Sequence, residues 1–480
     1  MATPTAKNHQ TVSQNSRYVI EFSSLLNRKT EVTVLDSILK QTETHFLSIF
    51  EDELGYGLKK ILPPIAIDII DLAIAIDTVD RLIKPDFNKQ KSKICVVLPI
   101  RNPEKFNSIS VQKELSDLLQ WSTGNDWKFQ FKKCSGLGRR IEQDNLLLPK
   151  ASPVDEVTLW SGGLDALAGL YTRLTSDDKK SFMLFGTGAN STVFKRQHTV
   201  FKQLQQEFAN RVSLSRLRFS LEYQDKRSQK NKMLRTRGVV FTLLGSAYAY
   251  LMDCNVLNLY ENGIGAINLP SESTVGLDHS RSTHPLTLLK VSNLVSDILG
   301  GVFKIRNPFL FSTKAQMCQS LTRDKKADLS ELTQSCDRPH RCKPVQCGYC
   351  SSCILRRQAL LASNLNDKNH YIVPHARQAT DEDCIYLDNM YSQVNTLRKI
   401  FEESKTRQSQ WRSLTKTFPV LDDIVDQTAT IEGVTEEKFR INLIKLFQAY
   451  IDEWGHVESH LWRDFSRNPI GSHKTRDIVP

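Results

Sequence analysis

Residues 157–169 read Val-Thr-Leu-Trp-Ser-Gly-Gly-Leu-Asp-Ala-Leu-Ala-Gly, and this stretch decides the fold. An apolar run ends in Ser161, and a helical pattern begins after Gly162 and Gly163. The two glycines allow a tight turn that brings backbone N–H groups against an anion. The following helix directs its positive end to the same point. Ser161 adds a hydroxyl donor, and Asp165 can hold a magnesium ion. The stretch therefore predicts a phosphate-binding strand–loop–helix unit.

The same residues also fit an ordinary Ser-Gly-Gly turn, with Asp165 as an acid that caps the helix. The loop is not the usual P-loop, because no Gly-Lys-Ser/Thr follows, and it is not GxGxxG. The choice between a phosphate site and a turn depends on the rest of the chain.

A cysteine cluster near residue 340 supplies that context. Two overlapping CxxC steps put three sulfurs on one turn, where Gly348 suits the bend, and a fourth cysteine lies upstream. Closely spaced thiolates are the tetrahedral ligands that zinc prefers. Disulfides, an iron–sulfur cluster and redox thiols are the alternatives. The polar residues 1–17 do not resemble a signal peptide, so we expect a cytoplasmic protein without structural disulfides. We predict a structural zinc site at Cys336, Cys347, Cys350 and Cys353, with His340 or Cys342 as possible substitutes for one ligand.

The order of the two signals resembles that of one family. The SGGLD loop resembles the SGGxDS pyrophosphate loop of ATP pyrophosphatases, although Ala166 stands where serine is usual. Followed by SC…CGxCxxC…R, it resembles QueC, the 7-cyano-7-deazaguanine synthase family, over roughly residues 155–365. The segments that begin at Arg235 and Asn307 are also similar to QueC segments that precede helices.

The resemblance implies an ATP-dependent enzyme. QueC adenylates the carboxylate of 7-carboxy-7-deazaguanine with release of pyrophosphate, an amine then displaces AMP, and a second ATP-driven step makes the nitrile. The protein's task is mainly alignment and charge neutralisation at the α-phosphate. ATP, Mg²⁺ and Zn²⁺ are the implied cofactors. The expected catalytic residues are Asp165, Arg235, Arg237 and Lys314, and the expected nucleotide-binding residues are Ser161, Gly162, Gly163, Leu164, Asp165, Glu261, Asn262 and Gly263.

One segment departs from QueC. Residues 276–285, Gly-Leu-Asp-His-Ser-Arg-Ser-Thr-His-Pro, replace the expected substrate loop. His279 and His284 are candidates for recognition of a base or handling of an amine, without a choice between them. An exposed polar loop is the alternative.

Length and patterning predict an α/β protein with a parallel-sheet, adenine nucleotide alpha hydrolase-like (PP-loop) core and extensions on both sides. The expected segments are a disordered arm at 1–17, an N-terminal α+β recognition domain at 18–150, the QueC-like domain with its zinc knuckle at 151–370 and a helical region at 371–480. Expected strands are 94–100 and 127–131. Expected helices are 111–119, a buried one within 61–82 that is too charged for a membrane span, 383–403 and 436–462.

The net charge of +11 favours anionic partners. The 64 basic and 53 acidic residues are spread along the chain without a dense basic tract. We therefore expect nucleotide binding in preference to nucleic-acid binding, and no membrane partner.

The enlarged architecture resembles the QueC-like proteins of bacterial anti-phage operons, those of Qat and type IV CBASS systems. This resemblance implies that an activated deazaguanine carboxylate is joined to an amine, including one on a partner protein from the same operon. The alternatives are ordinary 7-cyano-7-deazaguanine synthesis for queuosine, an RNA-modifying PP-loop enzyme and a non-catalytic nucleotide-binding module.

Overall fold

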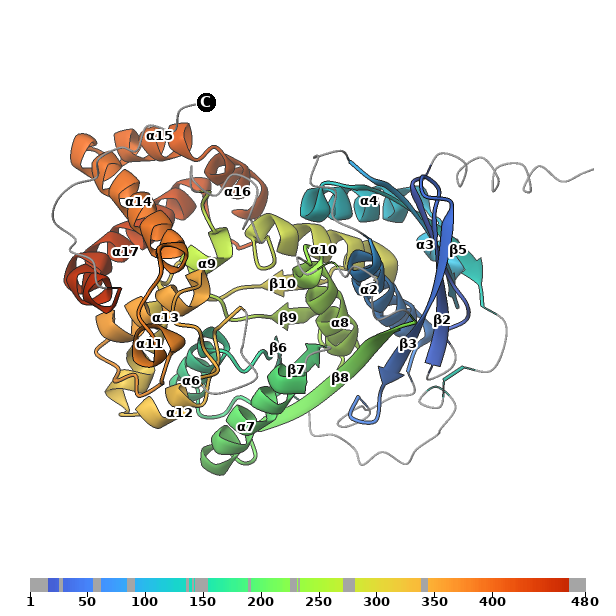
Figure 1. Ribbon diagram of the computed structural model, residues 1–480, viewed down its shortest axis with the longest axis horizontal. Coiled ribbons are helices and arrows are strands. Elements are labelled where there is room, and N and C mark those ends of the chain that lie inside the picture. Colours follow the sequence, from blue (N-terminus) through green and yellow to red (C-terminus); the bar gives the residue numbers. More distant parts are fainter. Residues whose placement is uncertain are drawn as a thin grey trace, which may run out of the picture. The chain divides into compact units, whose positions relative to one another are not determined.

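The computed structural model describes residues 16–25, 29–54, 62–83, 91–134, 138–139, 142, 154–188, 191–224, 231, 234–270, 281–337 and 344–465 (Figure 1). The predicted arm lies almost entirely outside these ranges, as do three predicted site residues, His279, His340 and Cys342. Backbone contacts divide the chain into two compact units. Unit 1 comprises Met1–Ser161, Asp177–Tyr260 and Ser280–Pro308, and unit 2 comprises Gly162–Ser176, Glu261–His279 and Phe309–Pro480.

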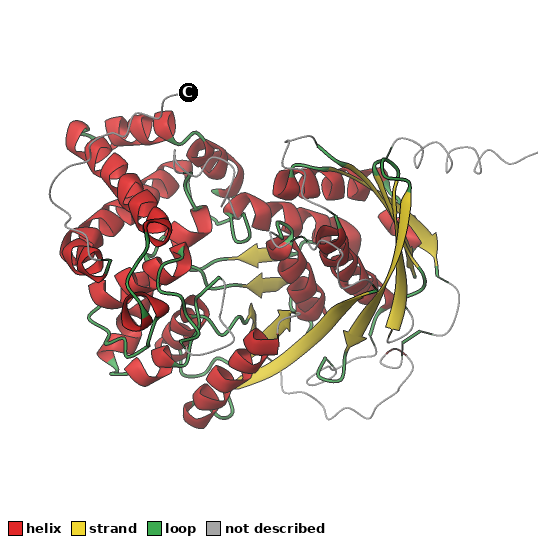
Figure 2. Cartoon of the chain, in the orientation of Figure 1, coloured by secondary structure: helices red, strands yellow, loops and turns green. Residues whose placement is uncertain are grey.

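Unit 1 contains a ten-stranded sheet in the order β10-β9-β6-β7-β8-β3-β2-β1-β4-β5, drawn in yellow in Figure 2. The strands are β1 (Tyr18–Phe22), β2 (Lys29–Asp36), β3 (Gln41–Phe50), β4 (Lys93–Ile100), β5 (Asp126–Lys133), β6 (Glu156–Leu159), β7 (Phe182–Gly188), β8 (Val212–Tyr223), β9 (Val256–Asn258) and β10 (Lys304–Arg306).

The sheet combines a parallel core with an N-terminal part. Strands β10, β9, β6, β7 and β8 are parallel to one another. β3 joins them antiparallel to β8, with Leu47 opposite Leu221, and β1, β4 and β5 form a second parallel set. This arrangement confirms the predicted α/β class with a parallel PP-loop core. It also shows that the N-terminal strands continue the same sheet, so the compact units do not follow the predicted boundary at residue 150.

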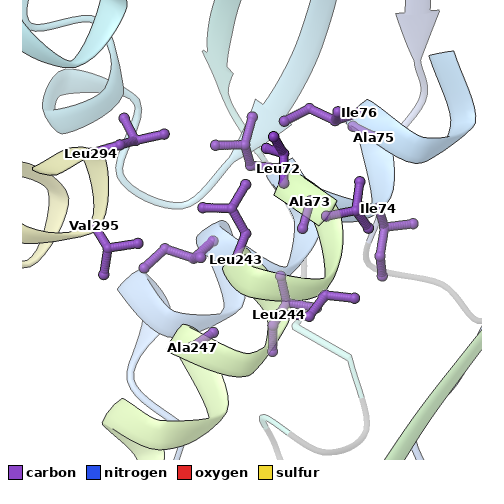
Figure 3. Close-up of a cluster of buried hydrophobic side chains, with 14 of the residues drawn as sticks. Leu72, Ala73, Ile74, Ala75, Ile76, Leu243, Leu244, Ala247, Leu294 and Val295 are labelled. Atoms are coloured by element: carbon purple, nitrogen blue, oxygen red, sulfur yellow. The ribbon is translucent and has the colours of Figure 1, made fainter. Parts of the chain in front are cut away.

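The helices of unit 1 are α2 (Pro64–Leu82), α3 (Pro103–Phe106), α4 (Ile109–Thr123), α7 (Ser191–Glu207), α8 (Arg237–Leu251) and α10 (Pro285–Leu299). α8 contacts β6, β7 and β9 of the parallel core, α2 packs against both α8 and β4, and α10 packs against α4 and α8. Figure 3 shows this core: Leu72 to Ile76 of α2 lie among Leu243, Leu244 and Ala247 of α8 and Leu294 and Val295 of α10.

The prediction of a buried helix within 61–82 is confirmed, and the acids that interrupt it have partners. Asp68 accepts the backbone N–H of Arg101 at 2.8 Å, and Asp71 accepts its guanidinium at 2.5 Å. Asp80 accepts both the backbone N–H and the hydroxyl of Thr236, at 2.9 and 2.8 Å. Buried carboxylates need such donors, since an unpaired charge in a core is strongly unfavourable. No helix of the described chain is long and apolar enough to be a candidate for crossing a membrane.

Unit 2 is helical. Its elements are α6 (Leu164–Ser176), α9 (Gly263–Ile267), α11 (Lys314–Arg323), α12 (Ala327–Glu331), α13 (Ser351–Ala362), the irregular turn η2 (Ile372–Ala376), α14 (Asp381–Glu403), α15 (Arg407–Thr417), α16 (Val420–Thr428) and α17 (Glu436–Asp464). α11 packs against α6 and α13, and α17 packs against α9, α13 and α14. The predicted helices at 383–403 and 436–462 are confirmed, and so are the strands expected at 94–100 and 127–131 in unit 1.

Candidate active site

Residues 157–169 form the end of a strand, a loop and the start of a helix, as predicted. β6 ends at Leu159, and α6 begins at Leu164. Gly162 has φ +71°, a left-handed conformation that favours glycine over other residues. The Gly163 carbonyl accepts the first-turn N–H of Leu167 at 3.0 Å, so Gly163 caps the helix and Asp165 lies in its first turn. Leu164 and Ala166 are buried, which leaves the first-turn acid as the polar group of this segment.

A second loop leaves the neighbouring strand. β9 lies parallel to β6, with Leu257 opposite Val157, so both strands end at the same edge of the sheet, where α/β proteins bind ligands. The chain after β9 brings Asn262 to Asp165: its amide Nδ2 donates to Asp165 Oδ1 at 3.0 Å and to Glu261 Oε1 at 2.8 Å. Its Oδ1 accepts the Gly265 N–H at 2.8 Å and caps α9.

Close packing explains why residue 263 is a glycine. A Cβ at this position would lie 2.0 Å from the Leu310 carbonyl oxygen and 2.6 Å from a methyl carbon of Leu446. The Gly263 N–H donates to the Ser312 carbonyl at 2.8 Å, which fixes this close approach. Only a residue without a side chain fits between these neighbours.

Lys314 completes the group. Its Nζ lies 2.6 Å from Asp165 Oδ2, and both side chains are largely buried. Lys314 is the first residue of α11, which Thr313 and Gln316 open with a capping box. The structure thus brings together Asp165, Glu261, Asn262 and Lys314, which come from three separate segments of the chain.

Burial and mutual charge shift the pKa values of two groups in this cluster. Burial and the charge of Asp165 raise the pKa of Glu261 to about 8, against the opposing effect of Lys314. Burial acts to lower the pKa of Lys314, but Asp165 and Glu261 outweigh it and raise the pKa. Lys314 therefore keeps its positive charge, and Glu261 holds its proton more tightly than an exposed glutamate does. The two carboxyl groups are oxygen ligands of the kind that Mg²⁺ takes, and an ammonium group suits a phosphate.

Four other predicted residues belong to unit 1. Ser161 is exposed in the loop. Arg235 and Arg237 are exposed at the start of α8, with Arg237 Cζ 5.3 Å from the Phe241 ring centroid. Their parts in the reaction stay predictions. His284 is buried and caps α10, since its Nδ1 accepts the Leu286 N–H at 3.2 Å.

The four predicted cysteines form a compact buried cluster. The Sγ atoms of Cys336, Cys347, Cys350 and Cys353 all lie within 4.8 Å of one another. The sulfurs of Cys347 and Cys353 are 3.8 Å apart, which is about the edge of a ZnS₄ tetrahedron with Zn–S bonds of roughly 2.3 Å. An iron–sulfur cluster would hold the sulfurs farther apart, because its inorganic core lies between them. The donor set fits zinc.

The backbone supports this cluster. The backbone N–H of Cys347 donates to Cys336 Sγ at 3.5 Å, and that of Cys350 donates to Cys347 Sγ at 3.3 Å. Such donors favour the thiolate form of the acceptor. Gly348 has φ +84°, and a Cβ there would lie 2.1 Å from the Val373 carbonyl oxygen, so the predicted glycine turn is confirmed. Cys350 is the N-cap of α13, which packs against α11. A zinc ion held here would therefore stabilise the helix that supports Lys314.

Residues 156–364 match the family model of the queuosine biosynthesis protein QueC. The match begins at the first residue of β6 and ends just after α13, so it contains the glycine loop, Lys314 and the cysteine cluster. It covers less than half of the 480 residues. Comparison with curated proteins found no match. This QueC-like region indicates an ATP-dependent synthase-type enzyme of the PP-loop class.

Sequence reasoning missed one residue that supports the site. Glu453 of α17 is half-buried, and its carboxylate accepts the Thr313 hydroxyl and, at 3.0 Å, the Gln358 amide. Thr313 directly precedes Lys314. The Thr-x-x-Gln capping signal at 313–316 was readable from the sequence, but no local pattern links it to a glutamate 140 residues later.

Proposed function

We propose that this chain is a QueC-like enzyme of anti-phage defence that adenylates a 7-deazaguanine carboxylate with ATP and couples it to an amine. The observation that carries the proposal is the cluster of Asp165, Lys314 and Glu261 beside the glycine loop, within the QueC-like region. Its charges suit a Mg²⁺–polyphosphate ligand. The amine acceptor is on a partner protein.

The chemistry follows from these groups. A carboxylate oxygen of the substrate attacks the α-phosphorus of ATP, the bond to the bridging oxygen breaks, and pyrophosphate leaves. The amine nitrogen then attacks the acyl carbon, AMP departs, and the amine loses a proton to solvent. Asp165 and Glu261 would hold Mg²⁺, which neutralises phosphate charge when bound, and Lys314 would bind phosphate oxygens as a point charge. Backbone N–H groups after Gly162 would complete the anion site.

Two features support a use other than nitrile synthesis. The chain extends beyond the QueC-like region at both ends by folded segments, β1–β5 with their helices and α14–α17. The buried Ala166 replaces a serine hydroxyl at the loop, which removes one donor from the polyphosphate site. We infer that this altered loop carries out one activation, which ends in an amide.

Pyrophosphate release from ATP, with and without 7-carboxy-7-deazaguanine, tests the adenylation. The full chain should release pyrophosphate only with the acid, and Asp165→Asn should abolish release. Asp328→Asn is the matched control, because Asp328 is also a first-turn acid but lies exposed on α12. Release that is unchanged in Asp165→Asn would contradict the assignment of Asp165, and no release from the wild-type chain would favour a non-catalytic nucleotide-binding module.

Intact-mass measurement of operon neighbours after incubation with the enzyme, ATP and the acid tests the acceptor. The proposal predicts a mass gain on one partner that equals the acid minus water. Free 7-cyano-7-deazaguanine in solution without a mass gain would instead establish ordinary queuosine-pathway synthesis. RNA-dependent pyrophosphate release would indicate an RNA-modifying enzyme.

A further inference from the structure

Trp121, near the end of α4 in unit 1, contacts Arg281 and Thr287, which are also hydrogen-bonded to each other. The Arg281 guanidinium lies over its ring, with Cζ 3.7 Å from the ring centroid, and donates to the Trp121 carbonyl at 2.8 Å. The indole N–H donates to the Thr287 hydroxyl at 2.9 Å, and this hydroxyl donates to the Arg281 carbonyl at 2.7 Å. The plane of the Arg281 guanidinium is therefore fixed.

A second arginine, Arg235, binds the end of the same helix as Arg281 does. Arg235 donates to the Thr123 carbonyl at 3.4 Å, at the end of the same helix. Burial and the charge of Arg235 both lower the pKa of Arg281. Within the described residues, these guanidinium groups donate to main-chain carbonyls, and no ion pair joins either of them to a carboxylate.

Two helices begin beside this pair. α8 starts at Arg237 and α10 at Pro285. Gly238 passes Ser282 so closely that a Cβ would lie 2.2 Å from its carbonyl oxygen, so the two starting segments touch. Each helix contributes partial positive charge at this end. The nearby His284 is neutral, since burial and the charge of Arg281 lower its pKa to about 4.

Capping of α4 explains only part of these contacts. Cationic side chains do bind the last carbonyls of helices. Among the residues that the structure describes, that role uses one N–H of each guanidinium, which has five. Two like charges next to two helix N-termini repel one another, and an anion that binds between them removes this repulsion.

We propose that Arg281 and Arg235, with Trp121 as their support, form a binding site for the oxyanion group of a small molecule, a carboxylate or a phosphate. A fixed guanidinium plane can form two parallel N–H···O bonds with either group. This inference rests on the proposed function only for its choice of probes, and it places the oxyanion site within unit 1. It also gives the N-terminal segment 18–150 a direct part in recognition, through Trp121.

Titration calorimetry on the full chain tests the site with three probes: inorganic phosphate, ATP, and 7-carboxy-7-deazaguanine. Arg281→Gln should weaken binding of at least one probe by roughly 10-fold or more, as expected for the loss of a charge-assisted pair. A loss confined to the acid identifies a carboxylate site, and a loss for phosphate and ATP identifies a phosphate site. Arg218→Gln is the matched control, because Arg218 is exposed on β8 with its guanidinium 5.4 Å from the Phe50 ring centroid; its affinities should equal those of the wild type.

Trp121→Phe provides a second variant. It keeps an aromatic ring but removes the N–H that holds Thr287, so it should weaken the same probe by a smaller factor. Unchanged affinities in both variants, or no binding of any probe to the wild type, would overturn the proposal. Pyrophosphate release by Asp165→Asn tests the proposed function separately. If Arg281→Gln weakens binding while Asp165→Asn releases pyrophosphate as the wild type does, the proposed function is contradicted and the oxyanion site is not.

Discussion

Replacement of Glu453 by alanine should destabilise unit 2 at the start of α11. Glu453 is half-buried and accepts two hydrogen bonds, from the Thr313 hydroxyl and the Gln358 amide, and both of these donor residues are buried. Its alanine variant leaves both donors without their acceptor. Each such loss costs about 1–3 kcal/mol, and relief of the buried carboxyl, whose pKa burial raises, offsets part of this cost. We expect a net loss of about 2–4 kcal/mol.

Urea unfolding followed by circular dichroism measures the global change, and hydrogen exchange of the first-turn amides of α11 measures the local one. Glu458→Ala is the matched control on α17: Glu458 pairs with Arg398 at 2.8 Å, and both side chains are partly exposed. Such surface pairs contribute about 0–1 kcal/mol. Glu453→Gln keeps one acceptor and should lie between the two. A Glu453→Ala variant as stable as Glu458→Ala, with unchanged exchange in α11, would refute the argument.

Three further predictions concern packing, titration and metal. Gly263→Ala should cost several kcal/mol of the free energy of unfolding through overpacking against backbone, whereas Gly301→Ala, whose Cβ meets nothing within 4 Å, should be nearly neutral in the same denaturant titration. His284 has a folded pKa of about 4 against 6.5, so the unfolded chain binds the proton first, and roughly 3 kcal/mol of stability present above pH 6.5 is lost as pH falls toward 4. His284→Asn keeps a capping acceptor and should remove this part of the pH dependence; an identical pH profile would contradict the assignment. The purified chain should contain one zinc ion by elemental analysis, and Cys350→Ser should reduce that content and lower the melting temperature; full zinc in the variant would exclude Cys350 as a ligand.

The elements that the sequence predicted well are set by local rules. The loop at 161–165 follows from two glycines between an apolar run and a helical pattern, and the cysteine cluster follows from ligand spacing. Helix α2 was predictable because its apolar residues surround it on every side, which is the pattern of a buried helix. In each case the signal lies within about 20 residues.

The elements that sequence reasoning did not give depend on distant contacts. The pairing of β3 with β8 joins residues about 170 apart, and no turn or alternation specifies that partner. Lys314 was a candidate from a resemblance, but its 2.6 Å approach to Asp165 depends on how α11 packs against α6. The division of the sheet and the helices between two units has the same origin, because the chain crosses between the units several times.

The two extensions support the QueC-like region in the same chemical way. In unit 1, the Asp80 carboxylate binds Thr236, the N-cap of α8, directly before Arg237. In unit 2, the Glu453 carboxylate binds Thr313, the N-cap of α11, directly before Lys314.

Both acids lie outside residues 156–364, and both threonines lie inside. A chain cut to the matched region would keep the glycine loop and the cysteines. It would lose the acceptors that fix the first turns of the two helices, and with α2 it would lose the apolar partner of α8. The extensions therefore fix the first turns that carry Arg237 and Lys314, and the proposed reaction would depend on them for this reason.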